Sequence, residues 1–342
     1  MSKINKRKID HVNLIKDHRE IDRDKAYFDF IHLEHRALPD VSLDEIDTSI
    51  SFMNKSLSFP LIISSMTGGS DDELITMNKN LALAAEAENV ALAVGSQRIL
   101  LKEETAEESF SLRKFAPSIL LFGNIGAVQL NYGITSKDCK RMIDVLDANG
   151  IYLHLNPLQE AIQPEGDTNF KNLDNKIKTL INEIDCPVLV KEVGSGFSPS
   201  DAERLKKIGI KYIDISGSGG TSWSLVESKR SEDARLGELY KDWGIPTPLA
   251  LKMLKPFKDD FEFIASGGIR NGLDMAKSII LGASLCGLAK PFLEPAQISA
   301  DAVRAEIQKL KKEFSVALFL LGINNVRDLI GREDLICYED RY

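Results

Sequence analysis

The residues best suited to chemistry follow short apolar runs of the chain. His154 and Asn156 alternate at the end of one run, Gln159 and Glu160 come just after it, and Lys191 ends the next run. Alternate residues of a strand point to the same side, so His154 and Asn156 share one direction. A histidine alone is usually a hydrogen-bonded core residue, and a loop glutamate is usually solvated. Their convergence instead favours a site in which Glu160 holds Mg²⁺ together with substrate phosphates.

Glycine-rich segments follow the last apolar runs. Residues 266–270 (SGGIR) and 287–290 (GLAK) are typical of loops that bind phosphate through backbone N–H groups, and residues 216–221 (SGSGGT) form a third donor-rich loop. Sharp turns alone would also require glycine. The occurrence of both segments at neighbouring strand ends favours a phosphorylated ligand. A Rossmann site is less favoured, because no GxGxxG motif follows the first strand.

A basic patch stands near the N-terminus of an acidic protein. It comprises residues 7–11 (RKIDH), and Arg98 follows an apolar run further along the chain. Such a patch is often only a solvated face. Arginine offers a bidentate fork and lysine a point charge, so the same residues could clamp a diphosphate.

Eight apolar runs must position these groups. Their centres are Leu61, Val90, Ile119, Ile151, Val188, Ile213, Phe263 and Leu285. Runs such as LIISS and PVLVK are apolar almost throughout, as in parallel strands buried on both faces. Most of the runs recur at roughly the 30-residue spacing of βαβ units. Residues 70–73 and 135–138 resemble capping boxes that begin helices, and residues 198–201 place Pro199 at a first helical position. The pattern predicts an α/β fold, a (β/α)₈ TIM barrel in preference to an open doubly wound sheet, with its site at the carboxyl ends of the strands.

Two further regions lie outside the repeating pattern of strands and helices. Residues 1–55 precede the barrel as an extension, expected to pack on its outside or its N-terminal end and to contribute substrate contacts, and residues 56–342 form a single barrel domain. Residues 224–244 are a charged insertion after the sixth strand. We expect this insertion to be poorly ordered, either as a mobile lid or as a surface excursion.

Composition excludes several classes of protein. The chain has 342 residues, 43% of them hydrophobic, and a net charge of −8, which argues against a nucleic-acid or anionic membrane surface. No apolar stretch reaches the roughly 18 residues of a membrane span, and no secretory signal is evident, so we expect a cytoplasmic protein. The four cysteines (Cys139, Cys186, Cys286 and Cys337) are widely spaced and are expected to be reduced packing residues.

These segments together resemble the type 2 isopentenyl diphosphate isomerases. The resemblance runs from residue 7 to about residue 290 and rests on eight ordered motifs: RKxDH at 7–11, SMTGG at 65–69, GSQR at 95–98, GNIG at 123–126, HxNxxQE at 154–160, KEVG at 191–194, GxGGT at 217–221 and SGGIR at 266–270. A single motif such as SGGIR would fit many flavin barrels. The ordered set is specific.

The resemblance implies an enzyme that interconverts isopentenyl and dimethylallyl diphosphate. It implies FMN in its reduced form, Mg²⁺, NADPH as the flavin reductant, and a homo-oligomer, a tetramer in the family. No strong acid is evident among the candidate side chains, whereas reduced FMN carries exchangeable N–H groups and can serve as proton donor and acceptor. The reaction would then be redox-neutral.

Residue roles carried over from the family fall into four groups. FMN would be bound by Met66, Thr67, Gly68, Ser96, Asn124, Lys191, Ser216, Thr221, Gly267, Gly268, Ile269, Arg270, Ala289 and Lys290. The substrate would contact Arg7, Lys8, His11, Arg98, His154, Asn156 and Gln159. Glu160 would bind Mg²⁺, and Gln159, His154 and Lys191 would form the catalytic group.

Two alternatives remain. The first is another FMN barrel that transfers hydride, of the hydroxy-acid oxidase or nucleotide dehydrogenase type. That chemistry needs a base or a nucleophilic thiol, yet residues 216–223 contain no cysteine and His154 is the only histidine after residue 35. The second is a flavin- or phosphate-binding protein without catalytic activity. Turnover assays distinguish such a binding protein from the isomerase and from the hydride-transferring enzyme.

Overall fold

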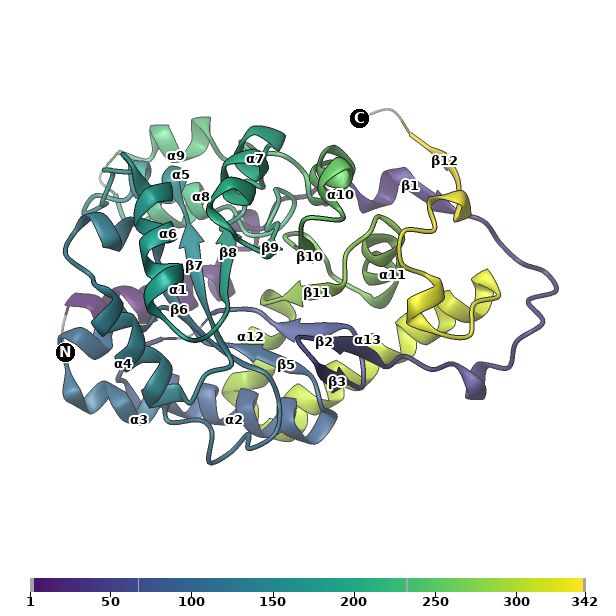
Figure 1. The fold of residues 1–342 in the computed structure, drawn as a ribbon, viewed down its shortest axis with the longest axis horizontal. Coiled ribbons are helices and arrows are strands. Elements are labelled where there is room, and N and C mark those ends of the chain that lie inside the picture. The colour runs from purple at the N-terminus through teal and green to yellow at the C-terminus, as the bar shows by residue number, and fades with distance from the viewer. Residues whose placement is uncertain (1–2, 67, 232, 341–342) are drawn as a thin grey trace.

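The central element of the fold is a closed barrel of eight parallel strands (Figure 1). The computed structural model describes residues 3–66, 68–231 and 233–340. The strands are β4 (Leu61–Ile63), β5 (Ala91–Ala93), β6 (Leu121–Gly126), β7 (Gly150–Leu155), β8 (Val188–Glu192), β9 (Tyr212–Asp214), β10 (Glu262–Ser266) and β11 (Leu285–Leu288), and β11 pairs with β4 to close the ring. The predicted (β/α)₈ barrel is confirmed.

The barrel strands are short and almost fully buried. Every residue of β4, β5, β6, β8 and β11 is buried, because side chains of one face fill the barrel and those of the other pack under helices. Two strands begin slightly later than the predicted centres. Val90 directly precedes β5, and Ile119 lies two residues before β6.

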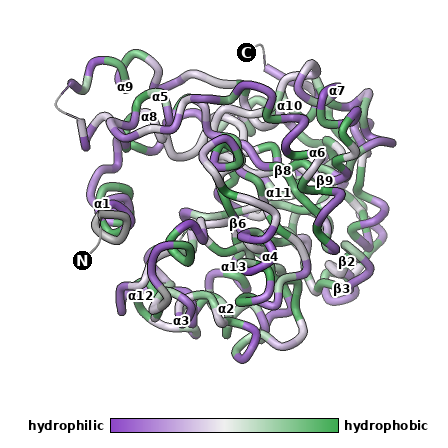
Figure 2. The backbone as a smooth tube through the Cα atoms, turned by 60° about the vertical axis from the view of Figure 1, so that its left-hand side comes forward, coloured by the Kyte–Doolittle hydropathy of each residue, from purple (hydrophilic) through white to green (hydrophobic). Residues whose placement is uncertain are grey.

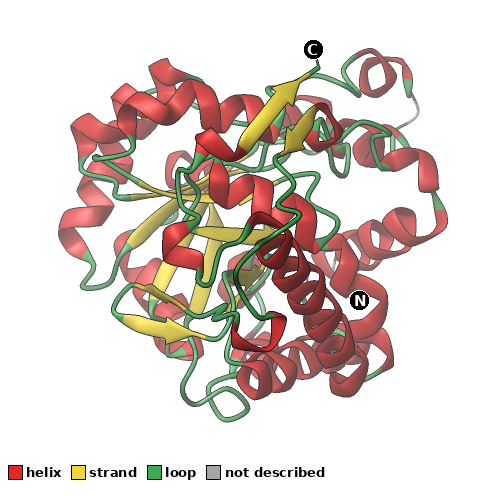
Figure 3. Ribbon diagram, turned by 90° about the vertical axis from the view of Figure 1, so that its right-hand side faces the viewer, coloured by secondary structure: helices red, strands yellow, loops and turns green. Residues whose placement is uncertain are grey.

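Helices surround the strands as an outer layer (Figure 3). The longer ones are α2 (Asp72–Glu88), α4 (Ser136–Leu146), α6 (Leu173–Glu183), α7 (Pro199–Ile208), α10 (Thr247–Leu254), α11 (Gly272–Ile280), α12 (Lys290–Ile298) and α13 (Ala300–Leu321). A capping box begins α4 as predicted, and α7 begins with Pro199 as predicted and also has a capping box. A helix also begins where residues 70–73 predict it, but the capping box expected there does not form at α2. Asp71 caps this helix by accepting from Glu73 N, while the Ser70 hydroxyl donates to Glu103.

The segment before the barrel covers both of its ends. The hairpin of β2 (Ile50–Phe52) and β3 (Lys55–Leu57) lies at the N-terminal end, where Lys55 donates to the carbonyl of Ser118 ahead of β6. Helix α1 (Lys3–Asp17) lies instead at the carboxyl mouth of the barrel, against α8, as Figure 2 also shows. The expectation that the whole extension packs on the outside or at the N-terminal end is therefore wrong for α1. Further along the extension, β1 (Ile31–Leu33) pairs with β12 (Ile336–Glu339).

The insertion after β9 is structured in its described part. It contains α8 (Trp223–Ser228) and α9 (Arg235–Leu239), and α8 contacts α1 and α5 (Pro157–Ile162). Ser224, Glu227 and Ser228 are buried. The expected poor order is therefore wrong for α8, because this helix packs between the N-terminal helix and the loop after β7.

All four cysteines are free thiols; Cys139 and Cys286 are buried and Cys337 is exposed. Burial raises the pKa of Cys139 to about 12, which suits an inert packing residue. Among the described residues, no helix is long and apolar enough to cross a membrane.

Candidate active site

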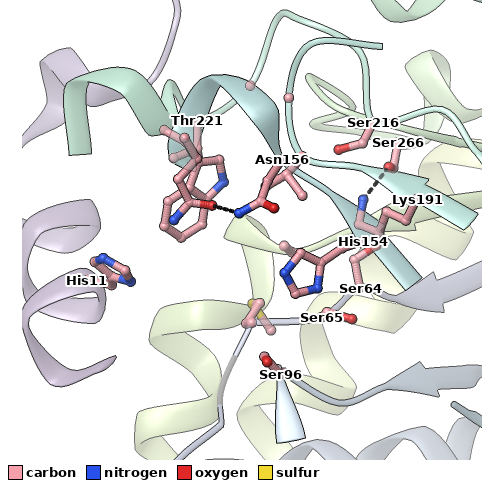
Figure 4. Close-up of a pocket in the computed structure, with 18 of the residues that line it drawn as sticks. His11, Ser64, Ser65, Ser96, His154, Asn156, Lys191, Ser216, Thr221 and Ser266 are labelled. Carbon is pink, nitrogen blue, oxygen red and sulfur yellow. Dashed lines mark hydrogen bonds between the residues drawn. The ribbon is translucent and has the colours of Figure 1, made fainter. Parts of the chain in front are cut away.

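One large pocket opens at the carboxyl ends of the barrel strands, with the helix of His11, α1, at its side (Figure 4). It brings together every predicted site residue that the structure describes: Arg7, Lys8, His11, Met66, Gly68, Ser96, Arg98, Asn124, His154, Asn156, Gln159, Glu160, Lys191, Ser216, Thr221, Gly267, Gly268, Ile269, Arg270, Ala289 and Lys290. Thr67 lies outside the described residues. The pocket is thus built from barrel strand ends together with the N-terminal helix.

His154 is held at the end of β7 as a neutral ring. Its Nδ1 lies 2.7 Å from Asn124 Oδ1, and the Asn124 amide nitrogen donates to Ser65 Oγ at 2.7 Å. An amide oxygen only accepts, so Nδ1 carries the hydrogen and Nε2 remains an acceptor. Burial, and then the charges of Lys8 and Lys191, lower the pKa of His154 to about 3. His154 is therefore uncharged at neutral pH in the free protein, with its single ring hydrogen on Nδ1.

Asn156 links the two polar residues of α5. Its amide nitrogen donates to Gln159 Oε1 and to Glu160 Oε1, both at 3.0 Å. The second oxygen of Glu160 accepts from Asp167 N at 2.6 Å. Burial raises the pKa of Glu160, although these hydrogen bonds oppose the shift. A bound cation would favour the ionised form of this carboxylate.

Glu227 is a buried acceptor behind the pocket residues His11 and Gln159, and the sequence pattern did not indicate it. It lies on α8 with a fully buried side chain, accepts from Gln159 Nε2 at 2.7 Å, and has one oxygen 3.1 Å from His11 Nε2. Its other oxygen pairs with Arg230. Burial disfavours its charge, but the neighbouring His11, the hydrogen bond from Gln159 and the charge of Arg230 hold its pKa at about 2. The surrounding sequence is charged and typical of a surface loop. Only the burial of Glu227 in the folded structure identifies it as part of the site.

Three cations face the same side of the pocket. Burial, and then repulsion from Arg7, lower the pKa of Lys8 to about 8, with Arg98 adding to the effect. Arg98 donates to Asp167 at 2.9 Å, and an Arg7 nitrogen lies 3.5 Å from Glu165. Three positive groups gathered on one side of a pocket are suited to an anionic ligand.

Lys191 lies at the carboxyl end of β8, deep in the pocket. Its ammonium donates to Ser266 Oγ at 3.2 Å and lies 3.4 Å from the buried carboxylate of Asp214. The Ser266 hydroxyl donates to the same carboxylate. This cation is therefore held in one position by groups from β9 and β10.

The glycine loops pack backbone against backbone. Gly267 and Gly268 have φ of +91° and +84°, a region that disfavours other residues. A side chain at Gly267 would begin 2.1 Å from the carbonyl of Gly217. Glycine is thus required here both for the turn and for the contact between the two loops.

The residues present fit a polar, phosphorylated cofactor and a single-carboxylate metal site. Within the described chain, the buried Arg7 Nε, Ser64 Oγ and Asn156 Oδ1 have no hydrogen-bond partner, and a polar ligand would satisfy such atoms. The described residues contain no cluster of three or more histidines, cysteines or carboxylates that could hold a metal. Glu160 therefore suits Mg²⁺ only if substrate phosphates supply further oxygens.

Fold and site together define a flavin-dependent barrel. Residues 154–336 match the FMN-dependent dehydrogenase family. A flavocytochrome b2 variant superposes with a TM-score of 0.69 at 18% identity, covering 96% of this chain and 82% of that one. A mandelate oxidase variant gives a TM-score of 0.63 at 17% identity, covering 94% and 98%. At these identities, the two structures show that the fold is shared.

Closer relatives identify the family within this class. The isopentenyl-diphosphate delta-isomerase of Hydrogenovibrio crunogenus is 50% identical over 338 residues, which cover 98% of each chain. That of Paracoccus zeaxanthinifaciens is 50% identical over 336 residues, covering 96% of each, and that of a Nostoc strain is 42% identical over 94% of this chain and 93% of its own. This chain belongs to the isopentenyl-diphosphate delta-isomerase family, in its FMN-dependent form.

Proposed function

We propose that this pocket interconverts isopentenyl diphosphate and dimethylallyl diphosphate by proton transfer. The observation that carries the proposal is the arrangement of two anion-binding regions around one barrel mouth. Strand β7, which bears His154 and leads to Glu160, is four strands away from β11 in the ring of eight, and β11 leads to the loop of Lys290. One pocket thus offers a flavin phosphate region and a substrate diphosphate region on opposite sides.

The diphosphate would bind beside α1. Arg7, Lys8 and Arg98 would offset its negative charge, and Asn156 would direct its unpartnered carbonyl oxygen toward a donor or a metal-bound water. Glu160 would hold Mg²⁺ against the same phosphate oxygens. These contacts would orient the hydrocarbon part of the substrate toward the centre of the barrel mouth.

The flavin would lie across the other side of the pocket. Its phosphate would bind the loops of residues 267–270 and 289–290, and Lys191, Ser216 and Thr221 would contact the ring system and side chain, with residues 66–68, Ser96 and Asn124 completing the site. When bound and reduced, FMN supplies exchangeable N–H groups on an electron-rich ring. The flavin reductant would be NADPH.

The side chains themselves are poorly suited to protonate an alkene. His154 is neutral, Glu227 is ionised, and Glu160 is assigned to the metal. Gln159, held by Glu227, would contact the reacting carbons and exclude water. His154 and Lys191 would fix the electrostatic field at the reaction centre.

The first test is a spectrum and an assay. Purified protein incubated with FMN should show bound oxidised flavin in the visible range. After anaerobic reduction, it should convert isopentenyl diphosphate in the presence of Mg²⁺, and product can be followed by NMR. Failure to bind FMN would refute the proposal, and so would flavin binding without isomerisation.

We also propose that the protein is a cytoplasmic homo-oligomer, a tetramer. Light scattering would measure its mass in solution.

A further inference from the structure

A segment of the N-terminal extension lies directly over the proposed phosphate loops. Residues 21–26, here termed the strap, run antiparallel to residues 220–222. Arg23 N donates to the carbonyl of Gly220 at 3.0 Å, and Ser222 N donates to the carbonyl of Ile21 at 2.8 Å. The strap is therefore joined to the glycine loop after β9 by backbone hydrogen bonds.

The strap is also held by the side chain of Arg23 and packs closely against two glycines through Ala26. The Arg23 guanidinium donates to three carbonyls, those of Gly194, Lys241 and Trp243, at 2.9, 2.7 and 3.2 Å. On the inner side, a side chain at Gly219 would begin 2.9 Å from Ala26 Cα. A side chain at Gly268 would begin 3.2 Å from Ala26 Cβ. The strap thus has a fixed position against the loop after β9 and the loop after β10.

Asp22 of the strap pairs with both cations of the proposed phosphate site. One oxygen accepts a hydrogen bond from Arg270, and the other lies 3.0 Å from Lys290 Nζ. Arg270 and Lys290 line the main pocket, and both also line a groove on the outer surface beside α12. Asp22 belongs to the outer groove and is not among the described residues that line the main pocket. The carboxylate therefore lies behind the two cations as seen from the pocket.

We propose that Asp22 is a positioning residue for the flavin phosphate. It holds Arg270 and Lys290 at the edge of the pocket before the phosphate arrives, so that less side-chain freedom is lost on binding. Two cations and one carboxylate leave one net positive charge, which a phosphate on the pocket side can still use. The opposite arrangement, in which the carboxylate competes with the phosphate for the same cations, would place Asp22 in the pocket. This inference rests on the proposed position of the flavin phosphate.

The test compares two flavins that differ only in the phosphate. Fluorescence quenching of FMN and of riboflavin gives both dissociation constants for the full-length apoprotein. The variants are Asp22→Asn, Arg270→Ala and the control Asp24→Asn, which changes an exposed carboxylate of the same strap. We expect Asp22→Asn to weaken FMN binding about tenfold and to leave riboflavin binding within twofold, because preorganisation acts only on the phosphate. The control should match wild type.

The outcomes separate this inference from the proposed site. If Arg270→Ala lowers the preference for FMN over riboflavin but Asp22→Asn leaves FMN binding unchanged or tightens it, the positioning role is wrong and the site stands. If neither variant alters the preference, the phosphate is bound elsewhere and both fail.

Hydrogen exchange of wild-type protein provides a measurement that does not depend on the folding of a variant. FMN should slow exchange of the Arg23 amide more than riboflavin does, because only FMN carries the phosphate that contacts the cations held by Asp22. Equal protection by both flavins, or by neither, would overturn the inference.

Discussion

Glu227 accepts a hydrogen bond from Gln159 at 2.7 Å across a sequence separation of 68 residues. The contact joins the insertion after β9 to the helix after β7, and His11 of α1 lies against the same carboxylate. Trp223, at the start of α8, packs edge to face on the His11 ring, with the two ring centroids 5.2 Å apart. One buried carboxylate thus fixes three segments around the proposed substrate.

Removing that charge should impair the reaction more than substrate binding. Glu227→Gln keeps the size of the side chain but removes the charge that His11 and Arg230 contact, and it lets Gln159 adopt the opposite amide orientation. We expect kcat to fall by at least about tenfold with a smaller change in KM. The exposed Glu238→Gln variant on α9 is the control. Equal kinetics in the two variants would show that Glu227 has no positioning role.

The free enzyme should lose substrate affinity in mildly alkaline solution. The pKa of Lys8 is about 8, so its charge is lost as the pH rises through that value, and with it one contact to the diphosphate. The profile of kcat/KM reports groups of the free enzyme and should fall above about pH 8. In Lys8→Arg the fall should move to higher pH, because arginine stays charged. An unchanged profile in this variant would exclude Lys8 as its origin.

The metal requirement should depend on Glu160. Replacing it with glutamine removes the negative charge and retains only one oxygen, so the Mg²⁺ concentration for half-maximal activity should rise about tenfold or more. Flavin absorption should not change. Glu183→Gln, an exposed substitution at the end of α6, should leave the Mg²⁺ titration as in wild type. The metal assignment fails if Glu160→Gln behaves in the same way as this control.

Glu192 should make the protein less stable at alkaline pH. Burial raises its pKa from 4.5 to about 8, although it accepts hydrogen bonds from Val193 N and Ser195 N. The folded state holds this proton more tightly than the unfolded state, so its contribution to stability is complete below pH 4.5 and is lost as the pH rises through 8.

The corresponding measurement is the melting temperature between pH 5 and pH 9, the range over which this stability is lost. In Glu192→Gln the amide oxygen can still accept both backbone hydrogen bonds, but no charge is buried. We expect the decrease across this range to be smaller than in wild type by roughly 5 °C. Parallel curves would mean that Glu192 is ionised throughout.

The strand ends were predictable because their pattern is local. Apolar runs, glycine turns and the polar residues that follow them are contiguous in sequence, and barrel geometry alone requires that all eight endings meet at one mouth. For this reason His154, Lys191 and the loop of Arg270 could be assigned to one pocket. The described site residues do line that pocket.

What could not be predicted depends on contacts between distant segments. The burial of α8 and the pairing of Asp22 with Arg270, 248 residues away, leave no local signature. The carboxylates in these contacts lie in charged stretches that are typical of solvated loops. At α2 a neighbouring residue misled the prediction, because Asp71 caps the helix and Ser70 binds Glu103 instead.

The central claim is that the flavin supports proton transfer without net oxidation or reduction. The measurement is anaerobic: the bound flavin is reduced once, excess reductant is removed, and isopentenyl diphosphate and Mg²⁺ are added in D₂O. Product and flavin spectrum are then followed together. We expect dimethylallyl diphosphate in large excess over enzyme, carrying deuterium, with the flavin still reduced at the end. Product limited to one equivalent per flavin, with the spectrum returning to the oxidised form, would contradict the proton-transfer account and favour a hydride-transferring oxidoreductase.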